Sequence, residues 1–218
     1  MKILTIIPCY NAEKYIESTI SDIKKYQENI LVIDDGSTDD SYNEMKKMKG
    51  VKILRHGKNR GKGAALKTGF NYALKNNFDA VITMDADGQH KASDIPKFIE
   101  KIDDFDIIIG NRMGDSRGMP LPNLISNRFS SYLVSRKSKN RIPDSQSGFR
   151  LIKKNIIESL DLNLDGYQME TEILLKAVKG GYKVGDVPIL TIYGDQVSYI
   201  SPLRVVKNFV RIMLKRQN

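Results

Sequence analysis

The first half of the chain alternates short, almost uninterrupted apolar runs with longer amphipathic segments. The apolar runs lie at residues 2–7, 30–33, 51–54, 80–84 and 106–109. Runs of this length without polar alternation are typical of strands that are buried on both faces, and helices between successive strands favour parallel pairing. The sequence therefore predicts an α/β fold in which a mostly parallel central sheet has helices on both faces.

The segments between and after these runs have apolar residues at helical spacing, which predicts helices there. Ile16, Ile20 and Ile23 form one inward stripe, with Asn11 expected as the N-cap and Glu13 in the first turn. Further helices are expected at about 41–48, from 63 onward and at 169–179. Another is expected after Ser93 or Asp94, with Pro96 in its first turn, and residues 119–141 are expected to form one or two amphipathic helices above the site. Strands are expected at 149–152 and within 183–192.

Two carboxylates stand one residue apart where the fourth apolar run ends. Asp85 and Asp87 follow residues 80–84, and side chains two residues apart in an extended chain point to the same side. Hard oxygen ligands of this kind suit Mg²⁺ or Mn²⁺ that is shared with substrate phosphates. Acidic turns after strands are common, so the pair by itself also fits an ordinary turn.

Other polar residues follow the ends of the neighbouring runs. Asn11 follows the first run, Asp34 and Asp35 follow the second, and Arg112 follows the fifth. In parallel α/β sheets, ligands bind beyond the carboxyl ends of the strands. We therefore expect these residues to line one ligand site together with the acidic pair.

Composition narrows the class of protein and its partners. The chain has 218 residues, of which 40% are hydrophobic and 28% charged, as in a soluble globular domain. The single cysteine, Cys9, excludes a disulfide framework and is expected to be a packed thiol. The net charge of +9 favours anionic partners, namely nucleotides, nucleic acid or an acidic membrane surface.

Several function classes lack their signals. There is no apolar run of about 20 residues and no signal peptide, so a cytoplasmic location is expected. No zinc spacing or aromatic-rich basic strand supports nucleic-acid binding. The glycines at 57, 61 and 63 do not have Walker spacing, although Lys62 and the amides of this turn could meet a diphosphate.

The remaining candidate residues each have a structural alternative. His90 could approach a metal or substrate, or lie behind the ligands. Glu170 and Glu172 could supply a general base or simply complement a helix dipole. The basic amphipathic segment 202–216 could lie on acidic lipid, as a peripheral contact at the cytoplasmic membrane face, or could pack on its own domain.

Taken together, the motifs resemble those of a known family. The segments IPCYNAE at 7–13, VIDDGSTD at 32–39, NRGKG at 59–63 and DADGQH at 85–90 resemble family 2 glycosyltransferases of the GT-A fold, a Rossmann-like nucleotide-diphospho-sugar transferase fold. The segments GNR at 110–112, DSQSGFR at 144–150 and ETE at 170–172 resemble the branch that contains dolichyl-phosphate mannose synthase. The resemblance predicts one catalytic domain over residues 1–200. The spacing of apolar and basic residues predicts that 201–218 is a C-terminal basic amphipathic helix.

The resemblance also implies a role for each matching residue. Asp85 and Asp87 would hold Mn²⁺ or Mg²⁺ on the donor diphosphate, and Asp87, Arg112 and Arg128 would be the catalytic residues. The donor, a GDP- or UDP-linked sugar, would be bound by Pro8, Tyr10, Asn11, Glu13, Asp35, Lys62, Asp85, Ala86, Asp87 and Gln89. The acceptor would be bound by Arg112, Arg128, Ser147 and Arg150.

The function implied is metal-dependent, inverting transfer of a hexose to a polyprenyl or dolichyl phosphate. One alternative keeps the donor but uses a saccharide hydroxyl as acceptor, in which case Glu170 or Glu172 would be the base. Another is a nucleotide-sugar-binding protein without catalysis. The segment 193–199 resembles the family's acceptor loop but has no Lys or Arg after its Ser, which weakens its expected grip on a diphosphate.

Overall fold

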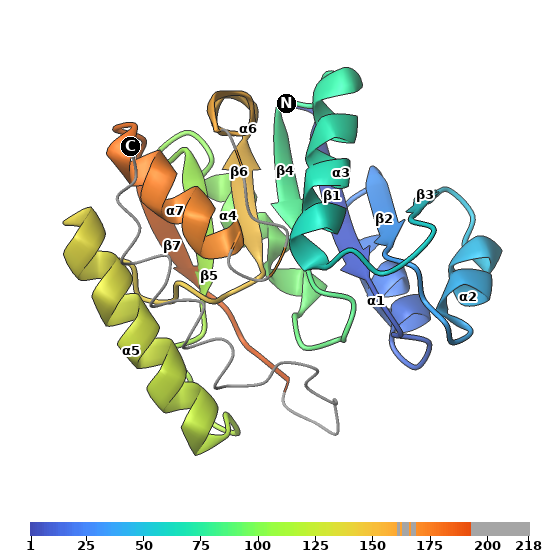
Figure 1. Cartoon of the computed structure of the whole chain (residues 1–218), viewed down its shortest axis with the longest axis horizontal. Helices are drawn as coiled ribbons and strands as arrows, with labels where there is room; N and C mark the ends of the chain where they lie inside the picture. The colour runs from blue at the N-terminus through green and yellow to red at the C-terminus, as the bar shows by residue number, and fades with distance from the viewer. Residues whose placement is uncertain (161, 163–165, 167–168, 193–218) are drawn as a thin grey trace.

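Seven strands form one sheet at the centre of the computed structural model, which describes residues 1–160, 162, 166 and 169–192 (Figure 1). The strand order is β3-β2-β1-β4-β6-β5-β7, and only β6 runs antiparallel to its neighbours. The strands are β1 (Ile3–Cys9), β2 (Ile30–Asp34), β3 (Lys52–Arg55), β4 (Ala80–Thr83), β5 (Ile107–Asn111), β6 (Arg150–Lys153) and β7 (Val184–Pro188).

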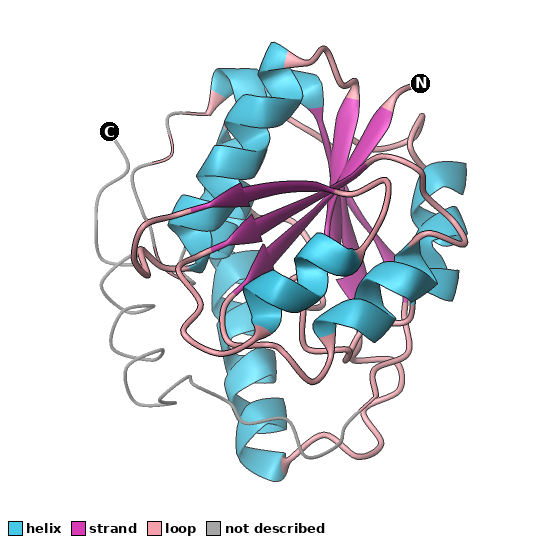
Figure 2. Ribbon diagram, turned by 90° about the vertical axis from the view of Figure 1, so that its right-hand side faces the viewer, coloured by secondary structure: helices cyan, strands magenta, loops and turns pink. Residues whose placement is uncertain are grey.

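Helices cover both faces of this twisted sheet, as predicted (Figure 2). One face packs against α1, α2 and α4, and the other against α3, α6 and α7. The helices are α1 (Ile16–Ile23), α2 (Ser41–Lys47), α3 (Lys62–Lys75), α4 (Ile95–Glu100), α5 (Leu121–Ser138), α6 (Lys154–Ser159) and α7 (Met169–Lys179), with a 3₁₀ turn, η1 (Ala92–Asp94), before α4.

The parallel strands bring their carboxyl ends to one edge of the sheet. Cys9 of β1 pairs with Asp34 of β2, and Ile6 of β1 pairs with Thr83 of β4. The loops that follow β1, β2 and β4 therefore leave the sheet side by side. This is the edge at which the sequence predicted a ligand site.

The antiparallel strand β6 adds a fourth loop to the same edge. Arg150, its first residue, pairs with Thr83 of β4 and with Ile109 of β5. The amino end of an antiparallel strand meets the carboxyl ends of its parallel neighbours. The segment 144–149 thus arrives beside the residues that follow β4, although the strand at 149–152 was predicted without a direction.

The start of α1 corrects one prediction. Ile16, Ile20 and Ile23 are buried as expected, but the helix begins at Ile16 and Asn11 does not cap it. Asn11 has a positive φ of 51°, and its side-chain oxygen accepts a hydrogen bond from the backbone N–H of Thr38 at 2.9 Å. Its polar side chain satisfies the neighbouring loop and leaves the helix end uncapped.

The second half adds elements that the sequence left open. Residues 119–141 contain one helix, α5, and the short helix α6 after β6 was not predicted. The segment 193–199, the domain boundary at 200 and the predicted helix at 202–216 lie outside the described residues. Within the described part of the chain, no helix is both long and apolar enough to cross a bilayer.

Cys9 lies in β1 and is only 1% exposed, as expected for a packed thiol. Burial, together with the nearby carboxylate of Asp34, raises the pKa of the Cys9 thiol from 9.0 to about 12. At pH 9 the thiolate fraction should be about five-hundred-fold lower than that of an ordinary cysteine. A thiol reagent at pH 9 should therefore leave the native protein unmodified and react once per chain in guanidinium; fast modification of native protein would contradict this.

Candidate active site

The loops after β1 and β2 are joined by hydrogen bonds at the predicted donor end of the site. The backbone N–H of Asn11 donates to Ser37 Oγ at 3.1 Å, and the backbone N–H of Asp40 donates to Glu13 Oε2 at 3.0 Å. Tyr10, which directly precedes Asn11, has 37% of its surface exposed. This leaves an aromatic ring and a carboxylate at the surface where a base and a ribose are expected.

Asp35 organises the glycine-containing turn that precedes α3. Its carboxylate accepts hydrogen bonds from the backbone N–H groups of Arg60 at 3.0 Å and Gly61 at 2.7 Å. Nδ1 of His56 lies 2.6 Å from the same carboxylate, and Nε2 of His56 lies 2.9 Å from Thr68 Oγ1. Asp35 is 3% exposed, so its established contacts position this turn, and contact with a donor stays a prediction.

The His56–Asp35 pair was missed in the sequence. The two residues are 21 positions apart and belong to loops after different strands. Parallel neighbours bring these loops together, so the fold was the only available signal. The pairing explains how α3 begins at Lys62 with its side chain toward the acidic pair.

Lys62 bridges two carboxylates at the centre of the site. Its Nζ lies 2.5 Å from Asp85 Oδ1 and 3.0 Å from Glu170 Oε1, and its side chain is 14% exposed. Burial opposes the charge on Lys62, but Asp85 and Glu170 outweigh it and raise the pKa of the ammonium. Burial likewise opposes the charge on Asp85, but Lys62 holds the pKa of this carboxyl well below its usual range. Both groups are therefore ionised.

Asp87 completes the acidic pair. Its Oδ1 accepts a hydrogen bond from the backbone N–H of Gln89 at 3.0 Å, and burial together with the charge of Asp85 raises its pKa. His90 is not solvated: its side chain is 4% exposed, its ring packs on Phe149, and its Nε2 lies 3.6 Å from Asp85 Oδ2. That distance is longer than a hydrogen bond, so His90 lies beside Asp85 without bonding to it directly.

These residues fit a divalent metal that is shared with a substrate. Among the described residues, no group of three or more His, Cys, Asp or Glu side chains forms a complete metal site. Asp85 and Asp87 would supply only part of the coordination, which suits Mg²⁺ or Mn²⁺ with phosphate and water as the other ligands. The Lys62 ammonium already lies against Asp85, so this carboxylate accepts a cation.

Gly148 lets the loop before β6 pack directly against this cluster. A Cβ at this position would lie 2.8 Å from Lys62 Nζ and closer still to Asp85 Oδ2. The carbonyl of Gly148 accepts a hydrogen bond from Thr83 Oγ1 at 2.8 Å, which holds the backbone in place. Only glycine leaves room here for the ion pair.

Gly148→Ala is expected to weaken binding of a nucleoside diphosphate with Mn²⁺ by about ten- to a hundred-fold, because a shift of the Asp85 carboxylate by about 1 Å misplaces the ligand. Calorimetric titration measures the affinity, and circular dichroism checks that the fold is kept. Gly57→Ala is the matched control, since nothing lies within 4 Å of a Cβ added there. Equal affinities for the two variants would contradict the predicted role of Gly148.

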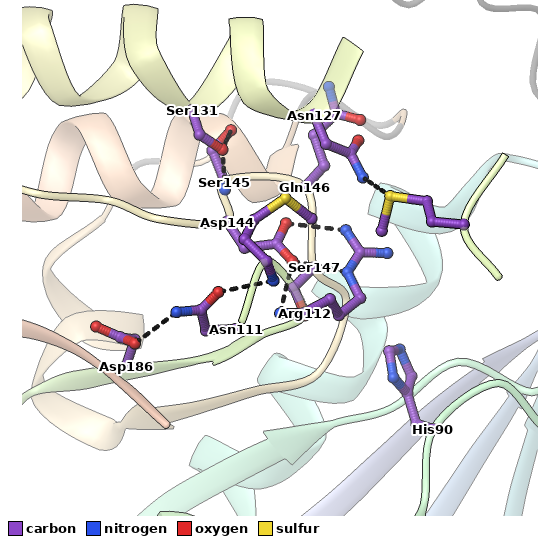
Figure 3. A network of polar contacts seen from close by, with 12 residues as sticks. His90, Asn111, Arg112, Asn127, Ser131, Asp144, Ser145, Gln146, Ser147 and Asp186 are labelled. Atoms are coloured by element: carbon purple, nitrogen blue, oxygen red, sulfur yellow. Dashed lines mark hydrogen bonds and ion pairs between the residues drawn. The ribbon is translucent and has the colours of Figure 1, made fainter. Parts of the chain in front are cut away.

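Arg112 directly follows β5 and forms a bidentate ion pair (Figure 3). Its Nε lies 2.7 Å from Asp144 Oδ2 and its Nη2 2.9 Å from Asp144 Oδ1, and Asp144 is fully buried. The geometry fixes the guanidinium plane. Arg112 remains 12% exposed at the side chain, and its contact with an acceptor phosphate stays a prediction.

The other three predicted acceptor residues lie in different surroundings. Arg128 is exposed on α5, and Ser147 is fully buried with no hydrogen-bond partner for Oγ within the described residues. Arg150 is 1% exposed, and its contact with an acceptor stays a prediction. Its nitrogens donate to the carbonyls of Ser147 at 2.7 Å, Ser145 at 2.8 Å and Glu170 at 2.5 Å. It clamps the loop before β6 to the start of α7.

Polar contacts tie the same loop to α5. The backbone N–H of Ser145 donates to Ser131 Oγ at 2.9 Å (Figure 3). Nε2 of Gln146 donates to Ser130 Oγ at 2.8 Å. Ser130 and Ser131 are buried. The position of α5 is therefore coupled to the loop that carries Asp144, the partner of Arg112.

The two candidate bases are both buried and both ion-paired. Glu170 lies against Lys62, and Glu172 Oε1 lies 2.8 Å from Nζ of Lys176 on the same helix. A general base for a hydroxyl must reach the substrate with a free lone pair. The structure thus gives Glu170 a role in holding Lys62 and Glu172 a role within α7.

Comparison with known proteins agrees with these features. A family model described as "Glycosyl transferase family 2" matches residues 5–161. A UDP-N-acetylglucosamine–dolichyl-phosphate N-acetylglucosaminyltransferase of Methanococcus voltae is 33% identical over 217 residues, covering 88% of this chain and 86% of that protein. A dolichol-phosphate mannosyltransferase of Pyrococcus furiosus is 33% identical over 203 residues, covering 86% of this chain and 56% of that protein.

A solved structure has the same fold. Glucosyl-3-phosphoglycerate synthase from Mycobacterium tuberculosis, in complex with Mn²⁺, uridine diphosphate and phosphoglyceric acid, superposes with a TM-score of 0.73. The sequences are 18% identical, and the match covers 98% of this chain and 76% of that one. The likeness supports the fold that the strand order describes.

Proposed function

The chain belongs to glycosyl transferase family 2 and has the GT-A fold, and we propose that it transfers a hexose from a nucleotide sugar to a polyprenyl phosphate. The observation that carries this proposal is the cluster at the end of β4. Asp85, beside Asp87, lies within 2.5 Å of the buried Lys62 ammonium, next to the loops that follow β1 and β2. Such a cluster suits a nucleoside diphosphate and its metal ion.

Each part of the cluster has a task in this reaction. Tyr10, Glu13 and the loop organised by Asp35 would hold the base and ribose, and Lys62 would lie against the diphosphate. A divalent ion on Asp85 and Asp87 would neutralise the charge that develops on the departing nucleoside diphosphate. The acceptor would attack the anomeric carbon from the opposite face, with inversion.

The relatives' names and the ion pairs of α7 support a phosphate acceptor. Both named relatives act on a dolichyl phosphate or dolichol phosphate. A phosphate monoester has a second pKa of about 6, so near neutral pH it is an anion that needs no general base. Glu170 and Glu172 are buried and ion-paired, so both are poorly placed to act as the base that a saccharide hydroxyl needs. Arg112 and Arg128 would orient the acceptor phosphate, with the protein peripheral on the cytoplasmic membrane face.

Transfer assays with purified protein test this function. The assay combines Mn²⁺ or Mg²⁺, a panel of GDP- and UDP-linked hexoses, and a short-chain polyprenyl phosphate. Metal-dependent transfer is expected with one donor, and Asp87→Asn should lower the rate by about a thousand-fold or more, because it removes charge stabilisation in the transition state. Asp103→Asn, an exposed carboxylate away from the site, is the matched control.

Two outcomes would overturn the proposal in different ways. Donor binding without transfer to the lipid, but with transfer to a sugar hydroxyl, would establish the saccharide acceptor instead. Failure to bind any nucleotide sugar in the presence of metal would reject the transferase function itself.

A further inference from the structure

The chain crosses one end of the sheet after β7. This strand lies at the edge of the sheet, three places from β4 in the strand order. Residues 189–192, which we call the strap, run from that edge toward the loop that follows β4 (Figure 1). The backbone N–H of Ile189 donates to the carbonyl of Asn111 at the end of β5 at 3.1 Å, and that of Ile192 donates to the carbonyl of Gln89 at 2.9 Å. The strap therefore joins the far edge of the sheet to the loop that contains the acidic pair.

The strap contacts this loop through the backbone, directly after Asp87. His90 and Thr191 form an antiparallel bridge, and the carbonyl of Gln89 accepts the N–H of Ile192. The N–H of Gln89 donates in turn to Asp87 Oδ1 at 3.0 Å. Two consecutive hydrogen bonds thus lead from the strap to a carboxylate of the predicted metal site.

One buried carboxylate holds the strap from the other side. Asp94, at the end of η1, is 4% exposed, and its Oδ2 accepts a hydrogen bond from the backbone N–H of Leu190 at 3.2 Å. Its Oδ1 lies 2.6 Å from Nζ of Lys97, and the same Nζ donates to the carbonyl of Pro188 at 3.2 Å. Asp94 and Lys97 together fix the backbone where the chain leaves β7.

Helix capping does not explain Asp94. It stands at the N-cap position of α4, where the sequence predicted a capping residue, but its side chain makes no capping hydrogen bond. An aspartate at this position usually accepts a hydrogen bond from the first turn of the helix. A buried carboxylate costs free energy unless it is paired and hydrogen-bonded, and the partners of this one are Lys97 and the strap.

We propose that Asp94 is a positioning residue for the metal-binding carboxylates and that it acts through the strap. Asp94 fixes Leu190, the strap fixes the backbone of Gln89, and Gln89 orients Asp87. The inference deepens the proposed function and rests on it, since the ion concerned is the one that Asp85 and Asp87 would hold. Groups that orient a metal ligand typically contribute about 10- to 100-fold to metal affinity.

Hydrogen exchange tests the clamp without metal or nucleotide. In Asp94→Ala the amide hydrogens of Leu190 and Ile192 should exchange several-fold faster than in the unmodified protein, because the strap opens more easily when its anchor is lost. Nuclear magnetic resonance measures both rates. Glu100→Ala, which removes an exposed carboxylate from α4, is the matched control and should leave both rates unchanged.

Calorimetric titration separates positioning from a general loss of structure. Asp94→Ala should weaken binding of a nucleoside diphosphate with Mn²⁺ by about ten-fold, the lower end of that range, because Asp94 acts at a distance from the ligand. Binding of the nucleotide without metal should stay unchanged, since the loops after β1 and β2 lie on the other side of β4 from the strap. Asp94→Asn keeps an oxygen for the N–H of Leu190 and should restore most of the metal-dependent affinity.

A second variant tests the same route without changing Asp94. Ile192→Pro removes the N–H that donates to Gln89, and Thr191 is already in an extended bridge, the conformation that a following proline favours. The same loss of metal-dependent affinity is expected. Leu190→Gln changes a side chain of the strap that is 44% exposed but keeps the backbone N–H, so it should bind like the unmodified protein.

Three results would overturn the inference. Unchanged amide exchange in Asp94→Ala would show that this carboxylate does not hold the strap. An equal loss of nucleotide affinity with and without Mn²⁺ would give Asp94 only a general structural role. Metal-dependent binding that stays intact in Asp94→Ala and Ile192→Pro would reject the positioning and leave the proposed function standing, whereas an unmodified protein without such binding would reject both.

Discussion

Arg150→Met is expected to lower the free energy of unfolding by about 3–6 kcal/mol, because three buried carbonyl acceptors each lose a hydrogen bond worth about 1–3 kcal/mol when left unsatisfied. Those carbonyls belong to Ser145, Ser147 and Glu170, at 2.8, 2.7 and 2.5 Å from the guanidinium. Urea unfolding followed by circular dichroism measures the change. Methionine keeps much of the apolar volume, so the loss reports the polar contacts.

Two further variants give this prediction its controls. Arg150→Lys keeps a charge but cannot span three carbonyls in three directions, so most of the loss should remain. Arg117→Met removes an arginine whose side chain is 90% exposed and paired with Asp115, and the midpoint of unfolding should not change measurably. If Arg150→Met unfolds at the same urea concentration as the unmodified protein, the three bonds do not hold the loop before β6 to α7.

Arg150→Met should also disturb the active site, because the loop held by Arg150 contains Gly148. A loosened loop no longer fixes the distance between Asp85 and Lys62. Binding of a nucleoside diphosphate with Mn²⁺ should therefore weaken in Arg150→Met even at temperatures where the variant is fully folded. This separates a positioning residue from the acceptor-binding residue that the resemblance implied.

The parallel half of the fold could be predicted because local pattern and tertiary position agree there. Uninterrupted apolar runs such as β1, which is buried throughout, leave no other place for a strand than the middle of a covered sheet. Once the strands are parallel, their following loops must meet, and Asp85 was placed correctly for that reason. The antiparallel direction of β6 could not be predicted, since a buried run such as Arg150–Lys153 has no pattern that depends on direction.

The α5 helix and the polar clamps could not be predicted for a different reason. Helical periodicity finds an apolar stripe but does not say which side of the helix faces the protein, and α5 buries serines because the loop at 145–146 offers them partners. The same limit applies to Arg112, whose partner lies 32 positions away, and to Arg150, which joins the loop before it to Glu170, 20 positions away. Residue type suggested phosphate binding for both, and the structure adds that Arg112 pairs with a carboxylate whereas Arg150 is surrounded by carbonyls.

Lys62→Met is expected to raise the Mn²⁺ affinity of the nucleotide-free protein by about ten-fold or more and to lower sugar transfer by about a hundred-fold or more. The ammonium lies 2.5 Å from Asp85 Oδ1, so a divalent ion approaching this carboxylate meets a positive charge. Two unit charges 4 Å apart interact by about 4 kcal/mol at an effective dielectric constant of 20. Removing a third of that repulsion already gives the ten-fold change, which corresponds to about 1.4 kcal/mol.

The same charge should make metal and nucleotide binding depend on each other. A diphosphate brings negative charge that compensates Lys62, so in the unmodified protein Mn²⁺ should bind much more tightly when a nucleoside diphosphate is present. By linkage the metal must then tighten nucleotide binding by the same factor. In Lys62→Met the factor by which metal and nucleotide tighten each other's binding should fall. The ammonium no longer repels the metal, and the diphosphate no longer has this ammonium as a partner.

Electron paramagnetic resonance measures free Mn²⁺ and so gives the Mn²⁺ affinity without any turnover. Measured with and without nucleoside diphosphate, for the unmodified protein and for Lys62→Met, it gives the four affinities to be compared. Lys75→Met, at the exposed far end of the same helix, should leave every one of them unchanged. If Lys62→Met binds Mn²⁺ no more tightly than the unmodified protein, the ammonium and the metal do not share Asp85. If the metal affinity rises but metal and nucleotide still tighten each other's binding by the same factor, Lys62 repels the ion without contacting the diphosphate. The loss of transfer activity in Lys62→Met would then have to come from the unpaired charge of Glu170.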